Sequence, residues 1–192
     1  MALKQIILFL LLLPSGGKKV VMIGCDLRKP QQPTNFNLTS STGLSNYLIG
    51  SATVEEIIQH APELGLDLIL SGPKPPNPSE ILLNERMGHL IELLKAKYDY
   101  VIMDSPPIGL ISDGLELSRY ADVTIYIVRQ NVTRKLHLDF INKIYLEGKM
   151  KNLCIIFNGV RLGGTVYGYG YGYGYGYGYG YGSYYEEETP PP

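Results

Sequence analysis

The sequence predicts a layered α/β domain with a mainly parallel sheet, followed by a low-complexity tail. Three observations lead to this prediction. Short apolar runs recur along the first part of the chain, helical patterns separate them, and the composition changes abruptly after residue 160. A length of 192 residues suits one domain with a core large enough to fold, plus a tail. We therefore expect a folded domain over residues 1–160 and a separate tail over residues 161–192.

Five apolar runs rich in Val and Ile are the candidate strands. They cover residues 20–25, 66–70, 100–104, 123–128 and 153–157. Polar and apolar residues do not alternate cleanly within them, which is typical of strands that are covered on both faces, as in a parallel sheet.

Helical patterns lie between these runs. Thr53 and Glu56 have the spacing of a capping box, in which each residue satisfies a backbone amide of the other. Residues 77–80, with proline at the first helical position, open the longest predicted helix, which continues to about Lys97. Another helix is predicted over residues 133–146. Strands that alternate with helices favour right-handed crossovers in one layered domain.

The N-terminal apolar run at residues 6–13 allows two interpretations. It is far shorter than the roughly 20 residues that a membrane-spanning helix needs. It has the length of a short signal peptide, but we favour a helix packed against the sheet, because a strand-like run follows directly.

The tail has a different composition. Tyrosine and glycine alternate from residue 167 to residue 182, and two tyrosines, three glutamates and three prolines follow shortly after. Glycine at every second position raises the entropic cost of ordering and leaves few side chains to pack, so we predict disorder over residues 161–192. Ten of the sixteen tyrosines lie here, which favours a modification target over a tail without a role.

Charge and cysteine content exclude some classes of function. The net charge is −1, so no global field attracts the chain to nucleic acid or to an anionic membrane, and we expect no nucleic-acid partner. Cys25 and Cys154 lie in apolar runs, where buried, reduced thiols are expected. Two cysteines give no disulfide framework and no metal-binding spacing.

The first segment whose residues could take part in chemistry is the run at residues 20–30. A predicted buried strand ends near Asp26, and the cations Arg28 and Lys29 follow. Ligands of parallel α/β sheets bind just outside the carboxyl ends of the strands. Asp26 could therefore hold a hydrated Mg²⁺ or orient a nucleophile. The structural alternative is an aspartate that pairs with Arg28 or caps a turn.

The second segment covers residues 98–107, where four apolar or aromatic residues lead into Asp104 and two prolines stiffen the loop beyond. This is the pattern of a Walker B strand, whose carboxylate binds the Mg²⁺ of a nucleotide directly or through water. Two strand-end aspartates in one domain are a more specific sign of a nucleotide site than either alone.

The third segment, residues 72–82, is predicted to be a rigid, proline-rich loop that enters a capped helix.

These three segments, together with residues 112–114 and the tyrosine-rich tail, resemble the bacterial tyrosine kinases. These are the autokinases attached to chain-length regulators of capsular and exopolysaccharide export. The resemblance covers residues 15–188, with the segments in matching order.

The resemblance implies a three-layer P-loop NTPase-like fold that binds ATP and Mg²⁺ at the strand ends. Asp26 matches the second aspartate of the family's Walker A′ motif and Asp104 matches its Walker B aspartate, so both are expected to be catalytic residues and Mg²⁺ ligands. Arg28 and Asn158 are expected to bind the nucleotide; Asn158 matches a position that contacts adenine in related ATPases. The implied activity is that of an ATP-dependent, non-specific protein-tyrosine kinase that regulates polysaccharide biosynthesis and export.

The resemblance also implies that tail tyrosines are autophosphorylated between the subunits of a ring. The expected phosphoacceptors are Tyr167, Tyr169, Tyr171, Tyr173, Tyr175, Tyr177, Tyr179, Tyr181, Tyr184 and Tyr185. The expected partners are a membrane-spanning chain-length regulator (polysaccharide co-polymerase), further copies of the chain and a protein-tyrosine phosphatase. The expected location is the cytoplasmic side of the plasma membrane, reached through the partner or through a missing N-terminal region.

Two features depart from the family pattern. Gly24 stands where the Walker A′ motif often carries its first aspartate, so one metal-site carboxylate is absent. The sequence also contains no G-x-x-x-x-G-K-[ST] loop, whose amides and lysine hold the phosphates; residues 15–19 lack the upstream glycine and precede a strand. We therefore expect a chain truncated just after this loop, with a central strand lacking and activity impaired. A non-catalytic phosphoacceptor or interaction module and a gene fragment remain the alternatives.

Overall fold

The computed structural model describes residues 14, 16–29, 41–106, 113–150 and 152–160, which belong to one compact unit, Met1–Val160. The apolar run at residues 6–13 and the tail at residues 161–192 lie outside the described residues. The predictions made for these two segments therefore stay predictions.

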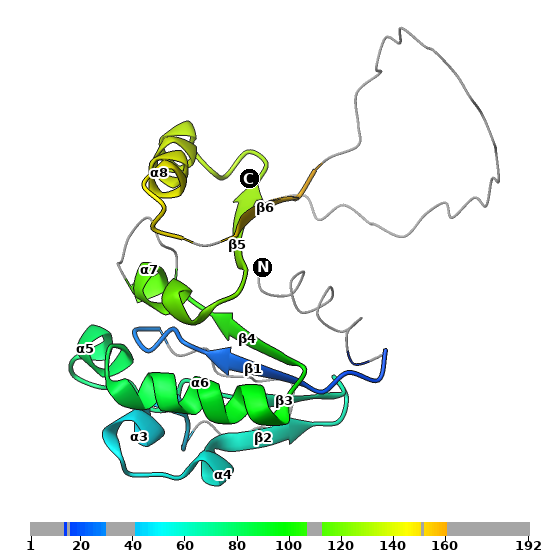
Figure 1. Cartoon of the computed structure of the whole chain (residues 1–192), viewed down its shortest axis with the longest axis vertical. Coiled ribbons are helices and arrows are strands. Elements are labelled where there is room, and N and C mark those ends of the chain that lie inside the picture. Colours follow the sequence, from blue (N-terminus) through cyan, green and yellow to red (C-terminus); the bar gives the residue numbers. More distant parts are fainter. Residues whose placement is uncertain (1–13, 15, 30–40, 107–112, 151, 161–192) are drawn as a thin grey trace, which may run out of the picture. The chain divides into compact units, whose positions relative to one another are not determined.

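Strands and helices alternate along the described residues, as the sequence predicts (Figure 1). In chain order the elements are β1 (Val20–Gly24), α3 (Leu44–Ile49), α4 (Val54–Ile57), β2 (Ile58–Ala61), β3 (Leu66–Ile69), α5 (Pro78–Leu82), α6 (Glu85–Lys97), β4 (Tyr100–Asp104), α7 (Asp113–Leu117), the short 3-10 helix η1 (Ser118–Tyr120), β5 (Thr124–Arg129), α8 (Lys135–Leu146) and β6 (Leu153–Asn158). Among the described residues, no helix is long and apolar enough to cross a membrane.

The strands form two sheets. The larger has the order β2-β3-β1-β4, in which β1 pairs in parallel with both β3 and β4 and only β2 runs antiparallel. The smaller is the parallel pair of β5 and β6. The mainly parallel α/β architecture is thus confirmed. In the described part of the chain, β2, β4, β5 and β6 each keep one edge without a strand partner.

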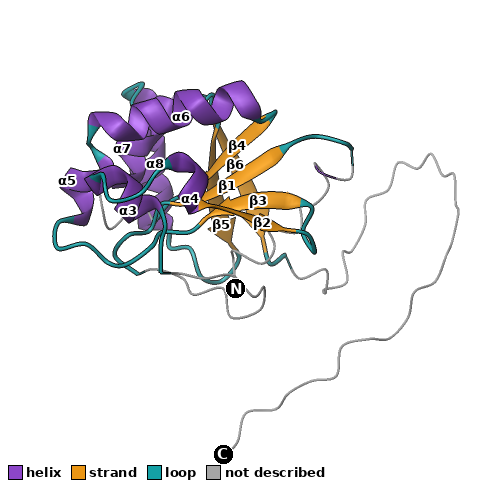
Figure 2. Cartoon of the chain, turned by 90° about the horizontal axis from the view of Figure 1, so that it is seen from below, coloured by secondary structure: helices purple, strands orange, loops and turns teal. Residues whose placement is uncertain are grey.

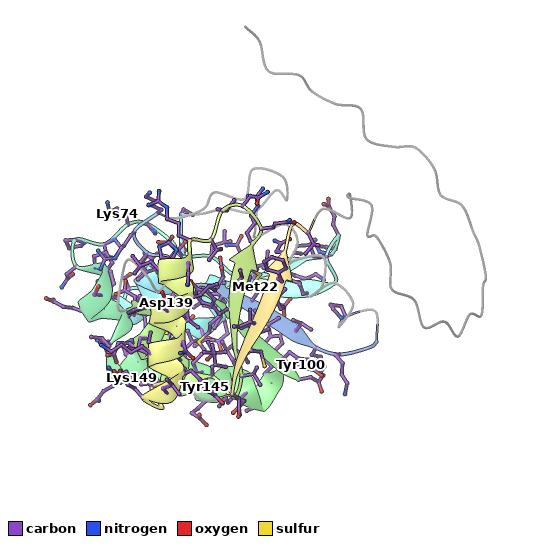
Figure 3. All side chains as sticks on the ribbon, turned by 90° about the horizontal axis from the view of Figure 1, so that it is seen from above. Met22, Lys74, Tyr100, Asp139, Tyr145 and Lys149 are labelled. Carbon is purple, nitrogen blue, oxygen red and sulfur yellow. The ribbon has the colours of Figure 1, made fainter. Side chains whose placement is uncertain are left out.

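The main core lies on one face of the larger sheet. The β1 residues Val21 and Ile23 are fully buried there, against apolar side chains of α3, α5 and α6. Figure 2 shows the helices gathered on one side of the strands. Met22, labelled in Figure 3, alternates with these residues and points to the other face, where it joins a smaller cluster with Val20 and Leu68. β1 is therefore buried on both faces, as its continuous apolar run predicts.

The predicted helix from residue 77 to Lys97 is two helices. α5 ends at Leu82, and α6 begins at Glu85 after a break at Leu83 and Asn84. The side chain of Asn84 accepts a hydrogen bond from the amide of Arg86 at 3.0 Å, which satisfies an amide that has no partner within α6. The prediction of one continuous helix was wrong because asparagine caps a helix better than it continues one.

The predicted capping box is present, but the helix that it opens is short. Glu56 accepts from the Thr53 amide at 2.7 Å, and the Thr53 hydroxyl accepts from the Glu56 amide at 3.4 Å. α4 ends at Ile57, and β2 follows at once, paired with β3 from Ile58 opposite Ile69. β2 is not predicted from the sequence, because the polar residues Gln59 and His60 leave it without a continuous apolar run; it forms a hairpin with β3, the next strand.

β6 contradicts the prediction that every apolar run is covered on both faces. Ile155, Ile156 and Phe157 are 57%, 40% and 56% exposed. β6 pairs only with β5 among the described strands, so its second edge and much of its surface stay open. For the same reason Cys154 is exposed, contrary to expectation, whereas Cys25 is buried as predicted.

Candidate nucleotide and metal site

The two predicted aspartates lie at the same edge of the larger sheet. In the parallel register of β1 and β4, Gly24 lies opposite Asp104. The ladder extends one residue further, because the amide of Cys25 donates to the carbonyl of Asp104 at 2.8 Å. Asp26 is the next residue of the chain. The structure therefore confirms that Asp26 and Asp104 are neighbours at the carboxyl edge.

The loop after β1 holds the Asp26 carboxylate in one orientation. Its Oδ1 accepts hydrogen bonds from the backbone amides of Arg28, at 3.1 Å, and Lys29, at 2.9 Å. Asp26 therefore caps a turn, as the structural alternative proposed, but it does not pair with the guanidinium of Arg28. One carboxylate oxygen carries both amide bonds, and the other can serve a ligand.

Asp104 has an unfavourable electrostatic environment. It is half-buried, and no side chain or amide among the described residues donates a hydrogen bond to its carboxylate. Burial, and then the negative charge of Asp26, raise the pKa of Asp104 to about 6. Two acidic side chains thus lie close together at the end of the sheet, and among the described residues no cation forms an ion pair with Asp104.

This pair fits a hard divalent cation. Mg²⁺ prefers oxygen ligands, and it is usually held by one or two carboxylates together with water and phosphate oxygens. Among the described residues there is no cluster of three or more acidic, histidine or cysteine side chains that could enclose a metal. The donor set is therefore that of an open Mg²⁺ site rather than a closed structural one.

Arg28 makes contacts that the sequence did not predict. Its Nε donates to Oδ2 of Asp113 at 3.1 Å, and its Nη2 donates to the hydroxyl of Ser79 at 2.5 Å. Contact of Arg28 with nucleotide stays a prediction. Ser79 and Asp113 were not predicted as site residues, although residues 72–82 and 112–114 had been noted as distinctive.

Asn158, the other predicted site residue among those described, lies in the smaller sheet. It ends β6, and its carbonyl accepts from the amide of Gln130 at 3.0 Å. Among the described residues, no hydrogen bond or ion pair joins Asn158 to Asp26 or Asp104. The ten tail tyrosines lie outside the described residues.

Comparison with known proteins first defines the class of the fold. The kinase domain of the Escherichia coli tyrosine kinase ETK superposes with a TM-score of 0.74 at 33% identity, over 84% of this chain and 64% of that domain. The Mg-ADP complex of the septum site-determining protein MinD from Pyrococcus horikoshii, 17% identical, superposes with a TM-score of 0.56 over 77% of this chain and 59% of that one. The domain therefore has the fold of the P-loop NTPases.

Relatives found by sequence identify the family, which the fold alone does not. The tyrosine-protein kinase YwqD of Bacillus subtilis is 38% identical over 146 residues, which are 76% of this chain and 62% of YwqD. A tyrosine-protein kinase relative from the cps region of Klebsiella pneumoniae is 35% identical over 144 residues, 75% of this chain and 20% of that protein. No protein-family model matches the chain. The chain is a homologue of the bacterial tyrosine-protein kinases, which confirms the resemblance, and it spans less than two thirds of these relatives.

Proposed function

We propose that this chain is an ATP-dependent protein-tyrosine autokinase domain that regulates polysaccharide biosynthesis or export. One observation carries the proposal: two aspartates, each at the end of a neighbouring parallel strand, form an open acidic pair on a P-loop NTPase fold. The relatives match this chain over three quarters of its length, and their names as tyrosine-protein kinases support the reaction class.

In this proposal Asp26 and Asp104 are the protein ligands of the Mg²⁺ that accompanies ATP. When bound, the ion would offset the negative charge of the phosphates. Asp26 would hold the ion through a bound water, which leaves its oxygen without an amide bond to accept the proton of the incoming tyrosine hydroxyl. The tyrosine oxygen then forms the new bond to the γ-phosphorus, the bond to the β–γ bridging oxygen breaks, and ADP leaves.

The proposal includes impaired catalysis by this chain alone. The sequence carries no G-x-x-x-x-G-K-[ST] loop, so phosphate charge would meet two carboxylates without the amides and lysine that normally stabilise it. The partners proposed for the chain are a membrane chain-length regulator, other copies of itself in a ring and a protein-tyrosine phosphatase. The proposed location is the cytoplasmic face of the plasma membrane.

Incubation of the purified chain with radiolabelled ATP and Mg²⁺ tests this proposal. We expect negligible labelling of tail tyrosines by the chain alone. If the wild-type chain labels itself strongly and Asp104→Asn abolishes the labelling, another group must hold the phosphates. The proposed impairment of catalysis would then be wrong. Labelling that Asp104→Asn leaves unchanged would contradict the role of the acidic pair.

A second candidate function is that of a non-catalytic phosphoacceptor. The observation in its favour is the concentration of ten tyrosines within residues 167–185. Mixing the chain with an intact kinase of the family, followed by phosphotyrosine mapping, separates the two functions. If Asp26→Asn and Asp104→Asn leave both cation binding and phosphorylation in trans unchanged, the acceptor function alone survives. A chain that neither binds cation nor becomes phosphorylated behaves as a gene fragment.

A further inference from the structure

Two distinctive segments of the sequence have no part in the proposed chemistry. One is the proline-rich loop and helix start at residues 72–82, and the other is residues 112–114. In the structure both reach Arg28, through Ser79 in the first turn of α5 and through Asp113 at the start of α7.

The three side chains form a closed triangle. The Ser79 hydroxyl donates to Oδ1 of Asp113 at 2.6 Å and accepts from Nη2 of Arg28 at 2.5 Å. Nε of Arg28 completes the triangle on Oδ2 of Asp113 at 3.1 Å. Both oxygens of the Asp113 carboxylate are therefore occupied.

Burial makes this triangle a strong constraint. The Asp113 side chain is only 2% exposed, whereas that of Arg28 is 40% exposed. A buried carboxylate without its partners is strongly destabilising, so Arg28 cannot leave without a large energetic cost. The triangle therefore fixes the loop after β1 to two helix starts that are 51 and 85 residues away in sequence.

The same loop carries Asp26. The backbone amide of Arg28 is one of the two donors to Oδ1 of Asp26. Holding the Arg28 side chain therefore holds a donor that orients the carboxylate. We propose that Ser79 and Asp113 are positioning residues, which act through Arg28 to hold the Asp26 carboxylate in place at the strand ends that it shares with Asp104.

The proposal rests on the proposed function only in taking the acidic pair to be a cation site. Its test uses the full-length chain, labelled with ¹⁵N, and Mn²⁺ alone as the probe. Two quantities are measured: the chemical shifts of the Arg28 and Lys29 amides without metal, and the Mn²⁺ dissociation constant from paramagnetic broadening of those amides. The first reports the turn around Asp26, and the second reports the site.

The informative variants are Ser79→Ala and Asp113→Asn, with Ser79→Thr as the conservative variant that keeps the hydroxyl. Ser118→Ala is the matched control, because its hydroxyl also makes a part-buried hydrogen bond, to the carbonyl of Leu115 in α7 rather than to the triangle. If Asp113→Asn does not fold, Ser79→Ala alone still tests the proposal, because it removes a neutral hydroxyl and leaves the buried Asp113 charge with Arg28 as its partner.

We expect Ser79→Ala and Asp113→Asn to shift both amides and to weaken Mn²⁺ binding by about tenfold, as for other residues that orient metal ligands. Ser79→Thr and Ser118→Ala should match the wild type. Unchanged amides and affinity in Ser79→Ala overturn the proposal, and so does an equal loss in Ser118→Ala. If the wild type binds no Mn²⁺, the proposed cation site fails, while the amide shifts alone still decide whether the triangle orients Asp26.

Discussion

Gly24 of β1 lies opposite Asp104 of β4 in a parallel register. Because the two strands end at the same level, the residues after Gly24 emerge beside the Asp104 carboxylate. Asp26 is close enough to contribute to the raised pKa of Asp104. This single pairing turns two strand-end aspartates, 78 positions apart in the sequence, into one acidic site.

Asp104→Asn is expected to stabilise the fold at neutral pH. The pKa of Asp104 is raised from 3.8 to about 6, so the folded state favours the protonated carboxyl. Folding therefore carries no penalty from this group below pH 3.8, an increasing penalty between pH 3.8 and 6, and the full penalty above pH 6. The variant should gain about 1–3 kcal/mol in free energy of unfolding at pH 7.5, since one pKa unit corresponds to about 1.4 kcal/mol.

Urea unfolding at pH 7.5 and at pH 3.5 measures this difference, and the gain should vanish at the lower pH. Asp67→Asn is the control, because Asp67 accepts hydrogen bonds from Tyr98 and His60 and its loss should destabilise the protein at pH 7.5. A gain of equal size at both pH values in Asp104→Asn would show that ionisation is not the cause.

Gly43→Ala is expected to destabilise the domain by about 2–3 kcal/mol. A Cβ at Gly43 would lie 2.3 Å from the carbonyl oxygen of Leu70 and 2.5 Å from the amide of Gly72, so backbone would have to move. Thermal unfolding measures the loss. Gly88→Ala is the matched control: the nearest atoms to its Cβ would belong to the Tyr120 side chain, at 3.4 Å or more, and alanine in α6 should gain up to about 1 kcal/mol. Equal melting temperatures for the two variants would contradict the close approach at Gly43.

Asn84→Ala is expected to cost about 1 kcal/mol of stability, because α6 loses the acceptor for the Arg86 amide. Asn84→Asp keeps that acceptor and should cost much less. Chemical unfolding of both variants decides the point. If alanine is tolerated as well as aspartate, the cap does not define the start of α6.

Phosphorylation of the tail is expected to weaken self-association. Each phosphate adds about −1.5 to −2 charges near the three glutamates at residues 186–188, so modified tails repel one another. The effect should be larger at low ionic strength, where screening is weak. Sedimentation of unmodified chain and of chain phosphorylated by an intact relative, at two salt concentrations, measures it. Equal association of both forms contradicts a role for the tail as a switch.

The sequence was sufficient to predict the α/β class and the strand ends that carry Asp26 and Asp104. Continuous apolar runs are local signals, and each aspartate directly follows or ends one. The same signals could not show that β6 is left exposed, because exposure depends on which strands and helices lie next to it. They also missed β2, because Gln59 and His60 interrupt its apolar pattern, although it forms a hairpin with β3, the next strand in the chain.

The partners of Arg28 show a further limit. The family resemblance implies that Arg28 binds the nucleotide, which stays a prediction. The structure pairs it with Ser79 and Asp113, two groups that lie far away in sequence. Only the fold brings these groups together, although the segments that contain them were already recognisable as unusual.

The most direct test of the acidic pair is Mn²⁺ binding measured by the EPR signal of the free ion. Wild type should bind one Mn²⁺ at pH 7.5, and less tightly below pH 6, where Asp104 takes up a proton. Asp26→Asn and Asp104→Asn should each weaken binding at least about tenfold, whereas Asp67→Asn should not change it. Binding that survives in both Asp26→Asn and Asp104→Asn, or is lost equally in Asp67→Asn, would contradict a shared cation site at the ends of β1 and β4.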